Sequence, residues 1–300
     1  MKTNIAVIGV GTQGSMIAFR NAVYGKQVTA YSRNESSREK CRARIERFLG
    51  FYVEEGRLTP DEADQVRNRI SYATSLEQAC ENASMIIENV PEILQVKQEL
   101  FRQLHEICEM GTLFSSNTSS LLMSEICANL PAERRAYTFQ VDHDDPVRNS
   151  YVEMMWNKDT SPETKKAALE HYRQLGFDPV ITEQEIKGYS INRVWRAVKK
   201  ECLKLWAKGY IAPSEFDRGW MTEWHTDIGP FKLMDLIGLD TILNIEYSYF
   251  QASGQEEDRP PVQLEEMVKA GKLGMKTGSG FYDGYDVEAG NLSVGKTKNP

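Results

Sequence analysis

The sequence predicts an α/β domain with a doubly wound, mostly parallel sheet, followed by an all-helical second domain. Short apolar runs alternate with helical patterns over most of the chain, which is typical of parallel strands joined by helices. A glycine-rich turn directly follows the first apolar run. Beyond Gly188 long helical patterns dominate and strand signals are few. We therefore expect a first domain over residues 1–187, a second over 188–285, and a flexible tail over 286–300.

The opening of the chain carries the clearest local signal. A short apolar run predicts a buried parallel strand, and Gly9, Gly11 and Gly14 follow it as G-x-G-x-x-G. In such a Rossmann-type unit the first glycine permits a tight turn, the second lets the backbone approach a pyrophosphate, and the third lets the helix pack against the strand. We expect these glycines, with Thr12 and Gln13 at the helix N-terminus, to bind a dinucleotide.

The end of the second predicted strand, at residues 28–31, bears on the choice of cofactor. An NAD-binding unit places an aspartate or a glutamate there to bind the ribose 2′-hydroxyl. This chain has Ser32 and Arg33 instead, and the arginine suits a 2′-phosphate. The sequence therefore favours NADP as the cofactor and leaves NAD possible.

The remaining elements continue the alternation. Two charged helices are expected after the second strand: the first opens with a capping box at Ser36 and Glu39, and the second begins at Thr59 with Pro60 and Glu62. Further strands are predicted at residues 70–73, 85–88, 113–116, 137–141, 151–156 and 180–181, and further helices at 75–80, 96–110, 122–128 and 161–176.

Composition limits the classes of function. The 300 residues carry a net charge of -7, which argues against nucleic acid as the main partner. No apolar run approaches the roughly 20 residues needed to span a membrane. Five cysteines, an odd number, are widely spaced, so we expect free thiols in a reducing cytoplasm. Four scattered histidines, with no cysteine pair at metal-type spacing, argue against a metal site.

Further motifs follow the glycine turn in a fixed order. They are Glu88 to Glu92 with Lys97, Ser-Asn-Thr-Ser-Ser-Leu at 116–121, Gly-Tyr-Ser-Ile-Asn-Arg at 188–193, and two C-terminal stretches at 229–240 and 276–282. Together they resemble the 3-hydroxyacyl-CoA dehydrogenase family, which also contains carnitine and L-gulonate dehydrogenases. The resemblance covers almost the whole chain. It implies a dinucleotide-binding domain, a helical domain that forms a homodimer, and reversible hydride transfer between a 3-hydroxy group and a nicotinamide.

The resemblance also implies catalytic roles. Ser119 and Asn192 would hydrogen-bond the substrate or the family's catalytic histidine, and Glu153 would orient that histidine. Alternatives stay open for two of them, because Ser119 can simply satisfy the backbone of its turn and Asn192 can cap a helix. Glu153 lies on an otherwise apolar strand, where a buried carboxylate needs a partner.

Three more residues are expected near the cofactor on the same grounds. The resemblance implies that Glu92 and Lys97 lie near the cofactor and the substrate entrance, and that Asn117 lies at the cofactor. A charged helix face exposed to solvent is the alternative interpretation of Lys97.

The segment that should carry the family's histidine departs from the pattern. The family has His-Phe-Phe-Asn-Pro, whereas this chain has Phe-Gln-Val-Asp-His-Asp-Asp-Pro at 139–146. Counting from the serine turn places Gln140 at the histidine position, and counting back from Glu153 places Val141 there. The nearest histidine is His143. Either His143 acts as the acid-base group from a rebuilt polar loop, oriented by Glu153, or the standard base is missing.

The sequence therefore predicts an NAD(P)-dependent oxidoreductase that interconverts a 3-hydroxy and a 3-keto group, on an acyl thioester or a small acid, with an altered histidine loop. Two alternatives are kept. A protein that has lost catalysis would bind the dinucleotide in a structural or sensing role, and a reductase of another polarised double bond would use a different proton donor. A homodimer is the expected assembly, because residues 191–250 are rich in large apolar side chains.

Overall fold

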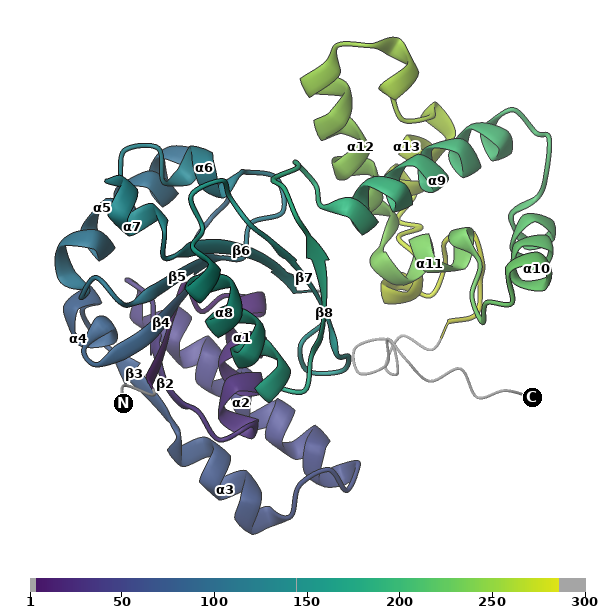
Figure 1. Ribbon diagram of the computed structural model, residues 1–300. Coiled ribbons are helices and arrows are strands. Elements are labelled where there is room, and N and C mark those ends of the chain that lie inside the picture. Colours follow the sequence, from purple (N-terminus) through teal and green to yellow (C-terminus); the bar gives the residue numbers. More distant parts are fainter. Residues whose placement is uncertain (1–3, 144, 286–300) are drawn as a thin grey trace. The chain divides into compact units, whose positions relative to one another are not determined.

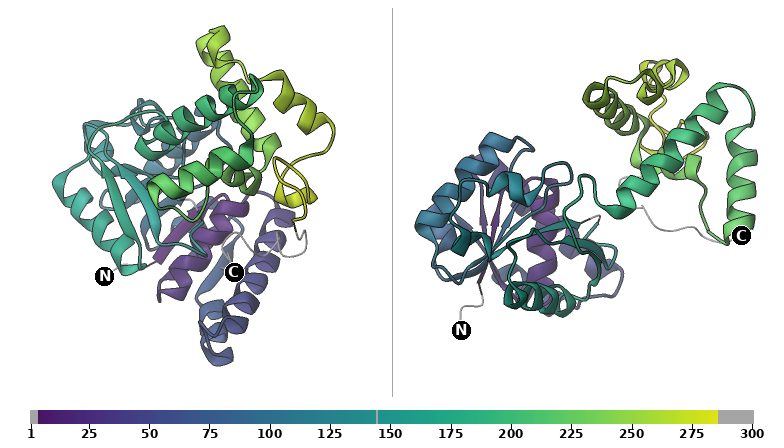
Figure 2. Two further views of the ribbon diagram at one scale, coloured as in Figure 1. Left: turned by 90° about the vertical axis from the view of Figure 1, so that its right-hand side faces the viewer. Right: turned by 45° about the horizontal axis from the view of Figure 1, so that its top comes forward.

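The computed structural model describes residues 4–143 and 145–285. These residues fall into two compact units, which divide between Ser190 and Ile191 (Figures 1 and 2). The expected domain boundary, between residues 187 and 188, falls close to this division. The expected flexible tail, at 286–300, lies outside the described residues.

The first unit is organised around a mixed sheet. Within the described residues this sheet has eight strands in the order β3-β2-β1-β4-β5-β6-β7-β8. Neighbouring strands are parallel except for β6 and β7, so the predicted doubly wound, mostly parallel sheet is confirmed. The strands are β1 (Asn4–Ile8), β2 (Gln27–Tyr31), β3 (Ile70–Ala73), β4 (Ala83–Glu88), β5 (Leu113–Ser116), β6 (Thr138–His143), β7 (Tyr151–Met155) and β8 (Asp178–Thr182).

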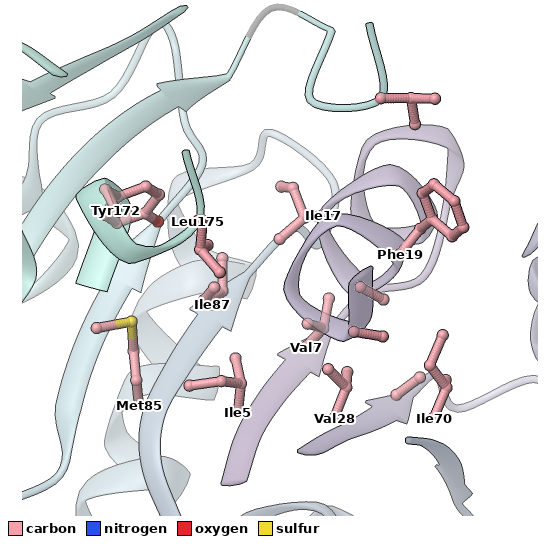
Figure 3. Packing of buried hydrophobic residues seen from close by; sticks show 14 of the residues in the cluster. Ile5, Val7, Ile17, Phe19, Val28, Ile70, Met85, Ile87, Tyr172 and Leu175 are labelled. Carbon is pink, nitrogen blue, oxygen red and sulfur yellow. The ribbon is translucent and has the colours of Figure 1, made fainter. Parts of the chain in front are cut away.

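Helices cover both faces of this sheet (Figure 1). In Figure 3, side chains of the sheet such as Val7 and Ile87 point toward the helices that carry Ile17 and Tyr172, and these residues belong to one buried apolar cluster. That face is covered by α1 (Thr12–Val23), α2 (Glu35–Glu54), α3 (Pro60–Asn68) and α8 (Pro162–Gln174). The other face is covered by α4 (Leu76–Cys80), α5 (Leu94–Ile107) and α6 (Met123–Ile126). The short α7 (Ala132–Arg135) lies between α6 and β6 in the chain.

The two predicted capping boxes have different outcomes. At the start of α3 the Thr59 hydroxyl accepts from the Glu62 N–H at 3.3 Å, and the Glu62 carboxylate accepts from the Thr59 N–H at 2.8 Å, so this box is confirmed. The box predicted at Ser36 is wrong. Asn34 has extended backbone angles and is the N-cap of α2, which places Ser36 inside the first turn.

The second unit is helical and contains no strand among its described residues, as predicted. Its core surrounds Phe231 and Met234. The buried carboxylate of Asp217 accepts from the N–H groups of Phe231 at 2.9 Å and Lys232 at 2.8 Å, at the start of α11. The helices are α9 (Ser190–Ala207), α10 (Pro213–Trp224), α11 (Pro230–Ile237), α12 (Leu239–Ser253) and α13 (Val262–Lys269), with short turns η1 (Glu256–Asp258) and η2 (Met275–Thr277).

Three further observations concern the sequence expectations. The five cysteines are buried and free of disulfides. No group of three metal-ligating side chains is found within the described ranges. Among the described helices, none has the length and apolar character that crossing a membrane requires.

Candidate active site

The turn between β1 and α1 is shaped by close backbone contacts. Gly9 has a φ of +92°, and a Cβ on it would lie 2.5 Å from the carbonyl oxygen of Asn89. A Cβ on Gly14 would lie 2.0 Å from the carbonyl oxygen of Gly9, whereas a Cβ on Gly11 would meet nothing within 4 Å. The first and third glycines therefore hold the turn against β4 and α1, and Gly11 leaves open space for a ligand.

A pocket of about 720 Å³ opens beside this turn, at the carboxyl ends of β1, β2 and β4. Open α/β sheets bind ligands at this place, where the strand order reverses. Gly11 is the N-cap of α1 and has no side chain to cap that helix, and the N-terminus of a helix attracts an anion. The residues present therefore fit the pyrophosphate and ribose of a nicotinamide dinucleotide, which would supply the hydride.

The sequence-predicted cofactor residues lie around this pocket in different ways. Ser32 and Arg33 line it, at the end of β2, and the Arg38 guanidinium donates to the Ser32 carbonyl at 2.6 Å. Thr12 is exposed at the start of α1. The side-chain amide of Gln13 donates to the carbonyl of His143 at 3.2 Å, so it ties the start of α1 to the end of β6.

Lys97 is buried beneath the loop that follows β4. It is 1 % exposed, and its ammonium donates to both oxygens of Glu88, at 2.7 and 2.9 Å, and lies 3.3 Å from the Glu92 carboxylate. Burial raises the pKa of Glu88, and the attraction of Lys97 opposes that rise. Lys97 therefore lies neither on a solvated helix face nor on the wall of the pocket, and its contacts hold the loop.

The serine turn after β5 is fixed from two sides. The Thr118 hydroxyl donates to Glu92, and the Ser120 N–H and hydroxyl donate to the same carboxylate at 3.0 and 2.8 Å. From the other side, the amide of Gln140 donates to the Thr118 carbonyl at 3.1 Å. Ser119 lies between these anchors with its side chain exposed. The turn therefore presents Ser119 to solvent from a rigid support.

The pairing of β6 with β7 determines which side chains share a face. Asp142 lies opposite Glu153, and His143 lies opposite Val152. Because successive residues of a strand point to opposite faces, Asp142 and Glu153 share one face and His143 points to the other. This register contradicts the expectation that Glu153 orients His143. His143 is also the last residue of β6, so the expectation that it lies in a polar loop is wrong.

His143 is part of the core beneath α8. It is 3 % exposed, and its ring centroid lies 5.4 Å from that of Tyr172 and 6.0 Å from that of Phe177. Its Nδ1 lies 2.9 Å from the Asn117 amide oxygen, and since that oxygen only accepts, Nδ1 carries the proton. Burial, with a smaller effect from His171, lowers the pKa of His143 to about 3. The ring is therefore neutral at physiological pH.

Gln140 lies on the same face as Glu153, whereas Val141 points to the opposite face. The Gln140 side chain is 1 % exposed, and its amide nitrogen and oxygen are both hydrogen-bonded to backbone groups around the serine turn. Its amide nitrogen donates to the carbonyls of Thr118 and Leu121, the latter at 2.8 Å, and its oxygen accepts from the Met123 N–H at 3.1 Å. Of the two positions that counting left open, Gln140 is the one on the Glu153 face.

Glu153 is 0 % exposed and gathers donors that sequence reasoning missed. Its Oε1 accepts from the Thr182 hydroxyl at 2.5 Å and from the Ser190 N–H and hydroxyl at 2.8 and 2.6 Å. Its Oε2 accepts from the Tyr151 hydroxyl at 3.0 Å. The signal for Tyr151 was available, because a residue two positions before Glu153 in a strand shares its face.

Asn192 lies in the first turn of α9, in the second unit, with its side chain exposed. Its role toward a substrate stays a prediction, as do the roles of Ser119 and Glu153.

The buried Glu88–Lys97 pair generates a stability prediction. Lys97→Met leaves the Glu88 carboxylate buried without its countercharge, so we expect the free energy of unfolding to fall by about 3–5 kcal/mol. Chemical denaturation measures it. Arg102→Met is the matched control on the same helix, because Arg102 pairs with Glu99 and Glu106 at the surface, where the expected loss is about 1 kcal/mol or less. Equal losses for the two variants would contradict the account.

Comparison with known proteins places these features in a family. The family model described as "3-hydroxyacyl-CoA dehydrogenase, NAD binding domain" matches residues 4–186, and the model of the C-terminal domain of the same family matches residues 188–284. A probable 3-hydroxybutyryl-CoA dehydrogenase of Bacillus subtilis is 34% identical over 279 residues, which cover 93% of this chain and 96% of the relative.

Solved structures agree with the sequence relatives. A diketoreductase superposes with a TM-score of 0.86 at 29% identity, covering 94% of this chain and 98% of the other. An (S)-3-hydroxybutyryl-CoA dehydrogenase from Ralstonia eutropha superposes with a TM-score of 0.82 at 27% identity, covering 95% and 99%. The chain therefore belongs to the 3-hydroxyacyl-CoA dehydrogenase family of NAD-dependent oxidoreductases that act on a CH–OH group.

Proposed function

We propose that this protein transfers a hydride reversibly between a nicotinamide and the 3-hydroxy or 3-keto group of an acyl thioester. The observation that carries the proposal is the meeting of elements at one edge of the sheet. The dinucleotide pocket opens at the carboxyl ends of β1 and β4, and the turn bearing Ser119 follows the neighbouring β5. β7 begins at this edge too, because it runs antiparallel to β6. Ser119 and Asn192 are the proposed hydrogen-bond partners of the substrate.

The choice of an acyl thioester rests on the relatives. The names of the Bacillus and Ralstonia proteins give a 3-hydroxybutyryl-CoA substrate. A small dicarbonyl compound is the second candidate, since the diketoreductase is described as catalysing reactions of dicarbonyl compounds. Both candidates contain a second carbonyl besides the one that is reduced, and they differ in the rest of the molecule that the protein must hold.

We also propose that the histidine segment is altered and that Gln140 occupies the position of the family's histidine. Three facts support this. The first is that Gln140 lies on the face of Glu153. The second and third explain why the segment is altered: the Gln140 side chain is fully hydrogen-bonded to backbone groups, and an amide carries no titratable proton. His143 is a poor substitute, because it points into the core with a lowered pKa. The acid-base group is then a residue other than these two.

A homodimer formed through the second unit and a cytoplasmic location remain part of the proposal. Large apolar side chains of this unit are exposed, including Val194 at 63 % and Trp224 at 64 %, and such surfaces are commonly buried against a partner. A monomer mass of 34.2 kDa, measured by light scattering at micromolar protein concentration, would contradict the dimer. Buried cysteines that form no disulfide suit a reducing compartment.

The preferred cofactor is proposed to be NADP(H). The residue after β2 is Ser32, so no carboxylate stands there to bind the 2′-hydroxyl or to repel a 2′-phosphate. The exposed Arg33 lines the pocket, and Arg38 lies against the Ser32 carbonyl. Two guanidinium groups near the expected 2′-position favour a phosphate over a hydroxyl.

Removing the Arg33 guanidinium tests this preference. We expect Arg33→Ala to weaken NADPH binding by about tenfold or more, the loss of one charge-assisted hydrogen bond, while NADH binding changes little. Fluorescence titration of both cofactors measures the ratio. Arg47→Ala is the matched control, because Arg47 is an exposed arginine of α2 that does not line the pocket. Wild-type protein that prefers NADH, with Arg33→Ala unchanged, would overturn the assignment.

A substrate comparison tests the proposed reaction. Acetoacetyl-CoA, free acetoacetate and a 2,4-diketone are supplied with NADPH or NADH, and the nicotinamide absorbance is followed. We expect turnover of the thioester, with the free acid slower because it lacks the remote binding energy of the CoA group. Faster reduction of the diketone would favour the second candidate. Tight dinucleotide binding without reduction of any compound would instead support a binding protein that has lost catalysis.

A further inference from the structure

We propose that Tyr151 is the residue that exchanges the proton with the substrate oxygen, and that Glu153 exchanges that proton with Tyr151. The inference rests on the proposed function and deepens it, because hydride transfer at a carbinol requires a group that takes or delivers the hydroxyl proton. It assigns this role to a side chain other than a histidine.

Tyr151 lies at the ligand-binding edge of the sheet. Tyr151 is the first residue of β7, and its neighbour Val152 lies opposite His143, the last residue of β6. Tyr151 therefore lies just beyond the carboxyl ends of the parallel strands, at the edge where ligands bind in this fold. It shares the face of Glu153 and Gln140, since it lies two residues from Glu153 along the strand.

The side chains of Tyr151 and Glu153 are in direct contact. The Tyr151 hydroxyl donates to Glu153 Oε2 at 3.0 Å. Tyr151 is partly exposed, whereas Glu153 is 0 % exposed, so the contact joins a residue that solvent reaches to a fully buried carboxylate. The other oxygen of Glu153 is held by Thr182 and Ser190, which fixes the carboxylate toward Tyr151.

A phenolic hydroxyl can accept one hydrogen bond while it donates another, which permits a two-step relay. In the oxidation direction, a bound nicotinamide would take the hydride with its electron pair as the C–H bond breaks. The substrate O–H bond breaks as its proton passes to the Tyr151 oxygen, and the Tyr151 proton passes to Glu153 Oε2. The phenol ends neutral and Glu153 holds one proton, which returns to water through Tyr151 after product release. Reduction reverses each step.

Equilibrium binding tests the contact without turnover. 3-Hydroxybutyryl-CoA carries a 3-hydroxyl that can donate to the Tyr151 oxygen, and butyryl-CoA lacks it. Tyr151→Phe should therefore weaken 3-hydroxybutyryl-CoA binding by about 2–10-fold and leave butyryl-CoA binding unchanged. Tyr137→Phe is the matched control, because Tyr137 precedes β6 and so lies at the opposite edge of the sheet. Equal effects on both ligands, or no effect on either, would overturn the contact.

Kinetics test the proton transfer. We expect Tyr151→Phe to lower kcat for acetoacetyl-CoA reduction by about 10²-fold with little change in nicotinamide affinity. Glu153→Gln should lower kcat as well, and the double variant should be no slower than the slower single variant, since the two residues act as one unit. If the wild-type protein reduces acetoacetyl-CoA and Tyr151→Phe has the same kcat, the role of Tyr151 is contradicted and the proposed function is not. A wild-type protein that neither binds nor reduces acetoacetyl-CoA contradicts the inference and the proposed function together.

Discussion

The antiparallel register of β6 against β7 is the constraint on which the candidate active site depends. It places Asp142 opposite Glu153, so one face collects Gln140, Glu153 and Tyr151 while His143 points into the core. A shift of one residue would exchange these two sets. The register is held by burial, because Val141 and Met154 are 1 % and 0 % exposed and cannot be turned outward without losing apolar contacts.

A network of buried ion pairs and hydrogen bonds holds the loops at the carboxyl ends of β4 and β5 in place. The Glu88–Lys97 pair lies under the loop after β4, and the Ser116 hydroxyl donates to the same glutamate at 2.5 Å. Glu92, from that loop, accepts from the serine turn, so β4 and β5 are joined beyond their last backbone hydrogen bonds. Glu92 and Lys97, which the resemblance places near the cofactor, thus also support the surface that presents Ser119.

Local patterns allowed much of the fold to be predicted. The glycine turn, the Thr59 capping box and the change to helical patterns near Gly188 are each encoded within a few neighbouring residues. The contacts of His143 and Lys97 are not, because they depend on strand register and on which helix face is buried. Counting residues could not decide whether Gln140 or Val141 stands at the histidine position, because the pairing register of β6 and β7 determines which of them shares the face of Glu153. Tyr151 was overlooked because none of the motifs on which the resemblance rests includes it.

We propose that no histidine carries the proton in this member of the family. The most direct measurement is the pH dependence of kcat for acetoacetyl-CoA reduction, in the wild-type protein and in His143→Asn. We expect no histidine-type inflection near pH ~6.5 and the same profile shape in both proteins. An inflection near that pH that disappears in His143→Asn would contradict it.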